Sequence, residues 1–280
     1  MDIYPDLCKE EMIMNCKEET ERICKFIKDT VKEAGAKGVV LGVSGGLDSA
    51  VVAMLVNKVF PWRRSNRPAE YIYMPMSYEI HNPEVYNLCY NILKVSHTTL
   101  PIDRELVNSI AQPRLESPIP KGNIIARLRM IKLYWIANGI NFLVIGTTNK
   151  SEHMIGYFTK YGDGACDFEP IQHLYKTEVY ELAKYLGVPN GILKAKPTAG
   201  LWEGQTDEGE IGMSYEKLDK ILRFIKVHSR WLQEHYGDIV FKIDKYPYLC
   251  DWGLAIGEVD KVKEMIRKSE HKRRLPRCLK

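Results

Sequence analysis

The segment that decides the fold is Gly38-Val39-Val40-Leu41-Gly42-Val43-Ser44-Gly45-Gly46-Leu47-Asp48-Ser49, in which a short apolar run leads into a glycine-rich loop. A β-branched run without polar side chains is typical of a strand buried on both faces of a parallel sheet. A helical stretch follows from Asp48 to about Val59. Glycines let backbone N–H groups converge, and a helix N-terminus adds about half a positive charge. The segment therefore predicts a phosphate-binding strand, loop and helix.

The polar residues of this loop suit a bound nucleotide. Ser44 and Ser49 offer hydroxyl groups to phosphate oxygens, whereas the negative charge of Asp48 would repel them. Asp48 therefore makes chemical sense as a ligand to Mg²⁺ that the phosphates share. The loop lacks the GxxxxGK[ST] pattern of a Walker motif. The alternative is an ordinary glycine-rich turn in which Asp48 merely caps the helix.

Working outward, helical and strand-like stretches alternate along the chain. Helices are expected at about 10–32, 83–94, 123–138 and 177–186, and further strands at 71–76, 97–102 and 141–146. Such alternation predicts a doubly wound, mostly parallel α/β sheet with helices on both faces and right-handed crossovers. Ligands of such sheets bind beyond the carboxyl ends of the strands. We therefore expect loops 44–49 and 147–152 to face one cleft of a single domain over residues 1–280.

The composition of the chain indicates its cellular location and its classes of partner. The chain has 280 residues, of which 45% are hydrophobic and 27% charged, and no apolar run reaches the roughly 20 residues that cross a bilayer. The first residues lack a basic region followed by an apolar run, so a secretory signal is not expected. The 7 cysteines are scattered and never spaced as CxxC, which argues against a disulfide framework or a zinc site. A cytoplasmic location without a membrane partner is predicted.

The Ser-Gly-Gly-x-Asp-Ser pattern resembles the loop of the ATP pyrophosphatase (PP-loop) superfamily, whose members cleave ATP between the α and β phosphates. The loop alone leaves open asparagine synthetase-like, GMP synthetase-like, tRNA-modifying and NAD synthetase enzymes. Later strings resemble NAD synthetase in content and order, and they span most of the chain: Lys121–Met130, Gly146–Glu152, Gly156–Gly164, Pro197–Trp202, Gly204–Glu208 and His271-Lys272-Arg273. The resemblance implies an adenine nucleotide alpha hydrolase-like fold.

The NH3-dependent NAD synthetase family activates the nicotinate carboxylate of deamido-NAD with ATP, and ammonia then displaces AMP. The resemblance implies Asp48 and Glu152 as Mg²⁺ ligands, and Asp163 and Lys176 as catalytic residues, Asp163 ordering ammonia. It implies that ATP is bound by Gly42, Val43, Ser44, Gly45, Gly46, Leu47, Asp48, Ser49, Thr147, Lys176 and Thr198. It implies that deamido-NAD is bound by Arg127, Lys160, Asp167, His271 and Lys272.

The C-terminal segment 261–280 is strongly basic, with nine lysines or arginines against Glu264 and Glu270. We expect it to form part of the deamido-NAD site, so that deleting residues 270–280 raises the KM for deamido-NAD far more than it changes folding. The other interpretations of such a run are a solvated tail or a nucleic-acid patch. Family resemblance implies a homodimer, for which the helix at 123–138 offers an apolar face.

Two features of the sequence bear on the nitrogen donor: the residues at 148–152 and the expected absence of a glutaminase domain. Residues Thr148-Asn149-Lys150-Ser151-Glu152 stand where bacterial ammonia-dependent forms typically carry Asp-His-Ala-Ala-Glu, and they are closer to the synthetase domain of glutamine-dependent forms. The sequence nevertheless leaves no room for a glutaminase domain, so free ammonia is the expected donor. Two rivals stay open: a tRNA-modifying ATP pyrophosphatase, and a nucleotide sensor that never turns ATP over. Nucleic acid is not an expected partner.

Overall fold

The computed structural model describes residues 14–61, 67–76, 82–111, 117–202, 204–236, 249, 252–276 and 278. Its sheet has four strands, all parallel, in the order β3-β2-β1-β4. The strands are β1 (Val39–Gly42), β2 (Ala69–Tyr73), β3 (Thr98–Thr99) and β4 (Leu143–Ile145). Val39 lies opposite Ala69 on one side and Leu143 on the other. The predicted parallel sheet is confirmed, with shorter strands than expected.

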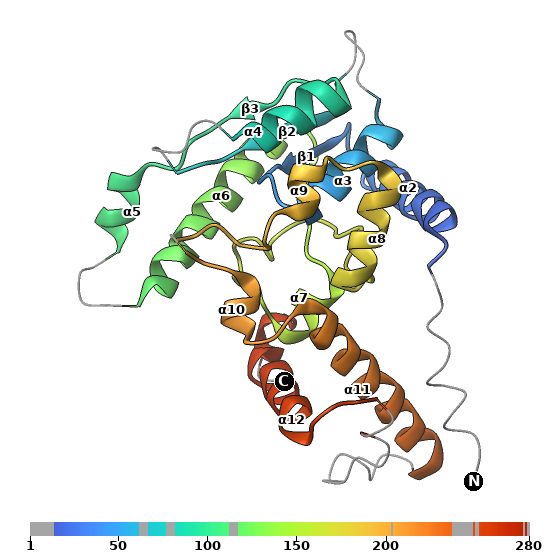
Figure 1. The fold of residues 1–280 in the computed structure, drawn as a ribbon. Helices are drawn as coiled ribbons and strands as arrows, with labels where there is room; N and C mark the ends of the chain where they lie inside the picture. The colour runs from blue at the N-terminus through green and yellow to red at the C-terminus, as the bar shows by residue number, and fades with distance from the viewer. Residues whose placement is uncertain are drawn as a thin grey trace.

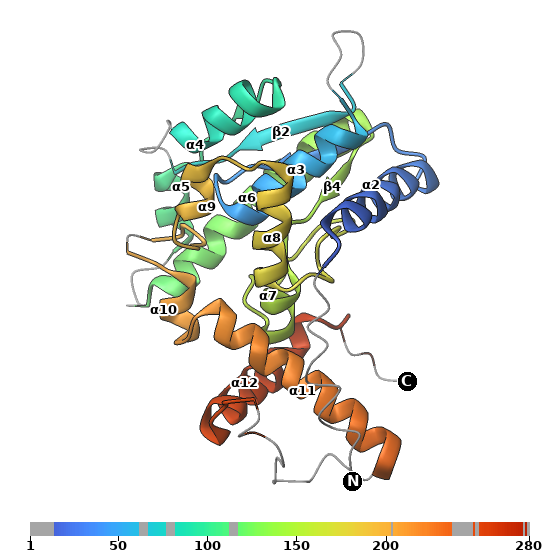
Figure 2. The same cartoon turned by 45° about the vertical axis from the view of Figure 1, so that its right-hand side comes forward.

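Helices cover both faces of this sheet (Figures 1 and 2). Side chains of β1 alternate between the faces: Val39 and Leu41 belong to one apolar cluster and Val40 to another. The first cluster joins the sheet to α2 (Cys16–Glu33), α3 (Leu47–Val59), α8 (Lys176–Leu186) and α9 (Asn190–Lys194). The second joins it to α5 (Arg104–Ile110) and α6 (Pro118–Ile140). The doubly wound prediction is therefore confirmed.

A third apolar cluster lies beyond α7 (Lys150–Ile155), at the far end of the molecule from β2 (Figures 1 and 2). It is built from helices that follow the sheet in sequence: α10 (Asp207–Ile211), α11 (Tyr215–Tyr236) and α12 (Ile256–Ser269), which runs into the short 3-10 helix η3 (Glu270–Lys272). Sequence periodicity assigned none of these helices. They matter for the site because α11 packs against both α7 and α8.

Two predicted helices differ from the structure. The stretch expected at 83–94 is a short α4 (Pro83–Tyr86) continued by a π-helix, η1 (Asn87–Leu93), which ends at Lys94 with a φ of 58°. The helix expected from residue 123 begins at Pro118 in α6, because Ser117 caps it and proline is tolerated in a first turn. The beginning of the helix expected at 10–32 lies outside the described residues.

The chain order of the strands fixes where a ligand can bind. From β1 the sheet grows through β2 to β3, whereas β4 lies on the other side of β1. Ligands of doubly wound sheets occupy the crevice at such a reversal, beyond the strand ends. The loops after β1 and β4 lead into α3 and α7. Among the described residues, none of the helices has both the length and the apolar character that a membrane crossing requires.

Candidate active site

The glycine-rich loop is held open by its own hydroxyl groups. Ser44 Oγ accepts the N–H of Gly46 at 3.1 Å, and Ser49 Oγ donates to the Gly46 carbonyl at 3.0 Å. Gly45 has a φ of +85°, and a side chain there would meet the amide of Asn82 at 3.0 Å. Gly46 is the N-cap of α3, and no side chain caps that helix. Asp48 is thus not the cap, and the N-terminus of α3 is available to phosphate oxygens.

A buried lysine joins the loop after β1 to the loop after β4. The ammonium group of Lys176 contacts the carboxylate of Asp48 and lies 3.2 Å from Glu152 Oε1. Only 3% of the Lys176 side chain is exposed. The amide of Asn149 donates to the other oxygen of Asp48 at 3.0 Å. The structure therefore brings together Asp48, Glu152 and Lys176, which the family resemblance nominated from three separate stretches.

Local helix geometry explains why Glu152 points inward. Asn149 caps α7 and its side chain accepts the N–H of Glu152 at 3.0 Å, while Glu152 Oε2 accepts the N–H of Asn149 at 3.4 Å. This capping box uses one carboxylate oxygen. The other oxygen, Oε1, faces Lys176, the first residue of α8. Two helix starts therefore position the charged groups.

A second layer of acids and phenols surrounds these charges. The hydroxyl of Tyr215 lies 3.3 Å from Glu152 Oε1 and 3.1 Å from Asp207 Oδ2, and its single proton can serve only one of them at a time. The Tyr157 hydroxyl lies 3.2 Å from Asp207 Oδ1 and contacts Glu210. Sequence reasoning gave none of these residues a role, although Asp207 falls within the family-like string Gly204–Glu208.

Burial dominates the electrostatics of this cluster. It raises the pKa of Glu152 to about 7, because the loss of water and the neighbouring Asp48 and Asp207 charges outweigh the attraction of Lys176. Burial by itself lowers the pKa of Lys176, but the Asp48 and Glu152 carboxylates outweigh it and raise that pKa. Lys176 is therefore a permanent positive charge at neutral pH.

The carboxylates fit a divalent cation that is shared with phosphates. No group of three or more His, Cys, Asp or Glu side chains that could hold a metal occurs in the described part of the chain. Mg²⁺ is usually held by one or two carboxylates together with substrate phosphates and water. Asp48 and Glu152 supply two carboxylates beside the phosphate loop, both of which contact the Lys176 ammonium group in this structure. The site therefore suits Mg²⁺ bound with a nucleotide, and not an all-protein metal cage.

Four of the residues expected to bind deamido-NAD lie together. Arg127 donates to the carbonyl of Lys160 at 3.3 Å, and Lys160 Nζ donates to the carbonyl of His271 at 2.5 Å. Lys272 Nζ donates to the carbonyls of Gly156 and Phe158, each at 2.7 Å. Lys272, alone of the four, lines an open pocket of about 460 Å³, together with Thr148, Phe158, Gly164 and Glu169.

The remaining nominated residues make local contacts. Asp167 accepts the N–H of Val144 at 2.6 Å and the hydroxyl of Tyr134 at 3.3 Å, which ties it to β4 and α6. Asp163 accepts the N–H of Thr159 at 2.9 Å and so closes its own turn. Thr198 Oγ accepts the N–H of Gly200 at 3.1 Å, and Thr147 lies in the loop between β4 and α7. Ligand binding by these four residues stays a prediction.

Comparison with known proteins decides between the superfamily branches. The family model described as NAD synthase matches residues 19–276. The chain belongs to the NAD synthase family. It is 44% identical to the NH(3)-dependent NAD(+) synthetase of Pyrococcus horikoshii, over 91% of either chain. The family and the fold class expected from the sequence are both confirmed.

Two solved structures resemble nearly the whole chain. An NMN synthetase from Francisella tularensis has a TM-score of 0.76 at 32% identity and covers 95% of this chain and 99% of its own. An NH3-dependent NAD synthetase from Campylobacter jejuni, solved in complex with the nitrate ion, has a TM-score of 0.74 at 31% identity, with coverages of 95% and 100%. The fold of this chain is thus shared with these two structures over nearly its whole length.

Because the pKa of Glu152 is raised, the free energy of unfolding of the ligand-free protein should depend on pH. An unfolded glutamate titrates near pH 4.3, so the folded state holds this proton more tightly. The free energy of unfolding that this proton contributes is fully present below about pH 4. It is lost as the pH rises through about 7. Glu152→Gln should therefore gain roughly 2 kcal/mol of unfolding free energy relative to wild type between pH 5 and pH 8. Urea denaturation at both pH values measures it.

The matched control is Glu258→Gln on α12, because the ion pair of that half-buried carboxylate with Lys217 lowers its pKa. This control should show no such gain between pH 5 and pH 8. Equal curves for wild type and Glu152→Gln at both pH values would contradict the burial argument.

Proposed function

We propose that this chain is an ammonia-dependent NAD synthetase, a carbon–nitrogen ligase that amidates deamido-NAD and converts ATP to AMP and pyrophosphate. The observation that carries the proposal is the Lys176 ammonium group, held between Asp48 and Glu152 beside the Ser44–Ser49 loop. It occurs in a chain that the NAD synthase model matches from residue 19 to residue 276. The tRNA-modifying alternative has no comparable support.

The chemistry asks for charge neutralisation more than for a nucleophilic side chain. An oxygen of the nicotinate carboxylate bonds to the α-phosphorus of ATP while the bond to pyrophosphate breaks. Ammonia then bonds to the acyl carbon, the acyl–phosphate bond breaks to release AMP, and the nitrogen loses a proton. Both partners of the first step are anionic, so Lys176 and the α3 N-terminus stabilise the developing charge. Mg²⁺, held by Asp48 and Glu152, would supply further neutralisation.

The other residues take roles that their contacts allow. The loop residues 42–49, with Thr147 and Thr198, bind ATP. The cluster of Arg127, Lys160, His271 and Lys272 binds the anionic groups of deamido-NAD, because arginine and lysine suit phosphates and carboxylates. Asp167 binds ribose hydroxyl groups, and Asp163 orders ammonia. The described cysteines, Cys16, Cys24, Cys89, Cys166 and Cys278, are free thiols. They suit a reducing compartment, and the cytoplasm is proposed.

The test is a product assay with deamido-NAD, MgATP and ammonium chloride. NAD, AMP and pyrophosphate should form in equal amounts, and glutamine in place of ammonium should give little product. Because one similar structure is named an NMN synthetase, nicotinate mononucleotide is the parallel acceptor. A higher kcat/KM with the mononucleotide would overturn the choice of deamido-NAD. Pyrophosphate release without either acceptor would overturn the ligase proposal.

We also propose that the enzyme is a homodimer that associates through α6. Ile131 and Trp135 lie one turn apart on this helix, and 55% and 73% of their surfaces are exposed. Exposed large apolar side chains that share a helix face are typical of protein interfaces. Trp135→Glu should convert a dimer into a monomer in analytical ultracentrifugation, while Tyr185→Glu, at an exposed aromatic residue of α8, should not. A wild-type monomer at micromolar concentration would contradict the proposal.

A further inference from the structure

The first turns of α11 carry a polar stripe, defined as Tyr215, Asp219 and Arg223. A spacing of four residues places these side chains on one face of the helix. That face meets α7 and α8, and α11 belongs to the layer of helices beyond the sheet (Figure 1). Tyr215 is 2% exposed and Asp219 is 1% exposed. Both are therefore polar groups in the interior, outside the residues that the proposed reaction uses.

Asp219 on α11 forms hydrogen bonds that hold the start of α8. One carboxylate oxygen accepts the Thr177 N–H at 2.9 Å, and the other accepts the hydroxyl proton of Ser151. Ser151 Oγ in turn accepts the backbone N–H of Lys176 at 2.9 Å. Asp219 therefore fixes the backbone on both sides of the peptide bond that joins Lys176 to Thr177.

The energetics of Asp219 call for a specific role. Burial raises the pKa of its carboxyl, and the hydrogen bonds from Ser151 and Thr177 and the charge of Arg223 only partly offset that cost. Neutral donors at a helix N-terminus offset part of this cost. An apolar residue would fill the same space more cheaply. An apolar residue could not hold the backbone of Lys176 in place. The Lys176 side chain is flexible, so its ammonium group reaches the two carboxylates reliably only if its backbone is fixed.

The rest of the stripe acts on neighbouring parts of the same site. The Tyr215 hydroxyl lies between Glu152 and Asp207, and its ring centroid is 5.0 Å from Lys176 Nζ. Arg223 donates to Glu178 at 2.6 Å, and Glu178 accepts the N–H of Tyr175 at 2.7 Å. The stripe therefore contacts the residues that orient Lys176 and Glu152, from a helix that lies far along the chain.

We propose that Asp219 is a positioning residue, which acts through Ser151 and the Lys176–Thr177 backbone to hold the Lys176 ammonium group between Asp48 and Glu152. Tyr215 orients Glu152 from the same helix face. Because the ligand of that centre is MgATP, this role rests on the proposed function. Binding of MgATP without any acceptor tests the role separately, since it does not depend on which molecule is amidated.

A double-mutant cycle between Asp219 and Lys176 distinguishes positioning from general stability. Isothermal calorimetry with MgATP alone gives the Kd of wild type, Asp219→Ala, Lys176→Met and the double variant. Asp219→Ala should raise the Kd by about 10- to 100-fold, the usual loss when the support of a ligand-binding group is removed. In the Lys176→Met background the same change should have less than about a threefold effect. The proposal would be overturned if the fold-changes in Kd of the two single variants multiplied in the double variant. An unchanged Kd for Asp219→Ala would also overturn it.

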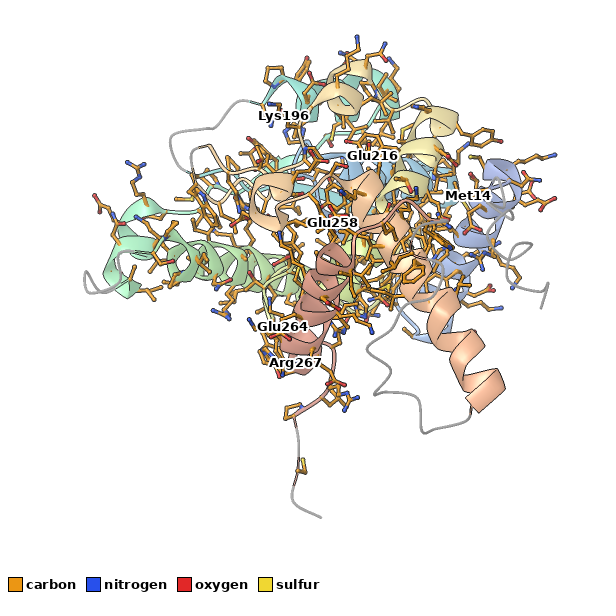
Figure 3. All side chains as sticks on the ribbon, turned by 60° about the horizontal axis from the view of Figure 1, so that its bottom comes forward. Met14, Lys196, Glu216, Glu258, Glu264 and Arg267 are labelled. Atoms are coloured by element: carbon orange, nitrogen blue, oxygen red, sulfur yellow. The ribbon has the colours of Figure 1, made fainter. Side chains whose placement is uncertain are left out.

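Conservative variants keep the test decisive if alanine disturbs folding. The amide of Asp219→Asn can still accept the Thr177 N–H, so its Kd for MgATP should stay within about fivefold of wild type. Ser151→Ala removes the acceptor of the Lys176 N–H, so it should raise the Kd as Asp219→Ala does. Glu216→Gln, one residue after Tyr215 and exposed on α11 (Figure 3), is the control and should leave the Kd unchanged. A Kd for Asp219→Asn as weak as that of alanine, with Ser151→Ala normal, would contradict positioning through Ser151.

Discussion

Replacing Lys176 by methionine is expected to lower kcat/KM for MgATP by about a thousandfold, roughly 4 kcal/mol, and to lower the unfolding free energy of the ligand-free protein by about 3 kcal/mol. Both losses have one cause. The ammonium group is the only cation in contact with Asp48 and Glu152 among the described residues, and both carboxylates are largely buried. Without it, the charge of Asp48 has no cation beside it, and Glu152 is held in its protonated form by burial. Steady-state kinetics at saturating deamido-NAD and urea denaturation measure the two effects.

A matched pair of variants separates catalysis from stability. Lys184→Met changes an exposed lysine of the same helix and should alter neither quantity. Asp48→Asn should lose activity as severely as Lys176→Met, because it removes a proposed Mg²⁺ ligand. It should lose less stability, since Lys176 keeps Glu152 at 3.2 Å. If the ligand-free Lys176→Met protein were as stable as wild type, the two carboxylates would not depend on this lysine.

The sequence predicted the strand, loop and helix start around Ser44–Ser49 because its signals are local. The apolar run before Ser44 and the glycines after it together specify a strand, a turn and a helix start within a dozen residues. Alternation of helices and strands then implied a parallel sheet, and a parallel sheet implies where its loops meet. The contact between Asn149 and Asp48 follows from that topology.

The layer around α11 could not be predicted in the same way. Tyr215, Asp219 and Arg223 have the spacing that any helix face shows, and no short motif marks them. The partners of Asp219 are far away in sequence, and the hydrogen bond to Ser151 spans 68 residues. Such contacts depend on how α11 packs against α7, which hydrophobic periodicity does not specify. The pairing became visible only once the three-dimensional arrangement was known.

The basic C-terminal segment also changes meaning once its contacts are known. Sequence alone presented it as charge available to a substrate. In the structure the amino group of Lys272 donates to the carbonyls of Gly156 and Phe158. The guanidinium group of Arg273 donates to the carbonyls of Met154, at 2.9 Å, and Ile266, at 2.6 Å. These bonds fasten η3 to the end of α7, so the segment shapes the candidate deamido-NAD pocket as well as charging it.

Lys272→Met is therefore expected to raise the KM for deamido-NAD by about a hundredfold, or roughly 3 kcal/mol, while the unfolding free energy falls by about 2 kcal/mol. The first loss reflects a missing charge beside the pocket, and the second reflects two carbonyls that lose their donor. Kinetics at saturating MgATP and urea denaturation measure them. Arg274→Met is the control, because that exposed side chain forms a surface ion pair with exposed Glu270 and should change stability by less than about 0.5 kcal/mol.

Deletion of residues 270–280 extends the same reasoning. A loose, purely electrostatic tail would raise the KM and leave folding intact, as the sequence alone suggested. The bonds from Lys272 and Arg273 lead us to expect that the deletion also destabilises the protein, by more than Lys272→Met does. The loss of unfolding free energy should be compared with the rise in KM for deamido-NAD. A segment that holds the pocket together should lose stability and pocket shape at the same time. A deletion variant with wild-type stability and a raised KM would show that the segment contributes charge alone.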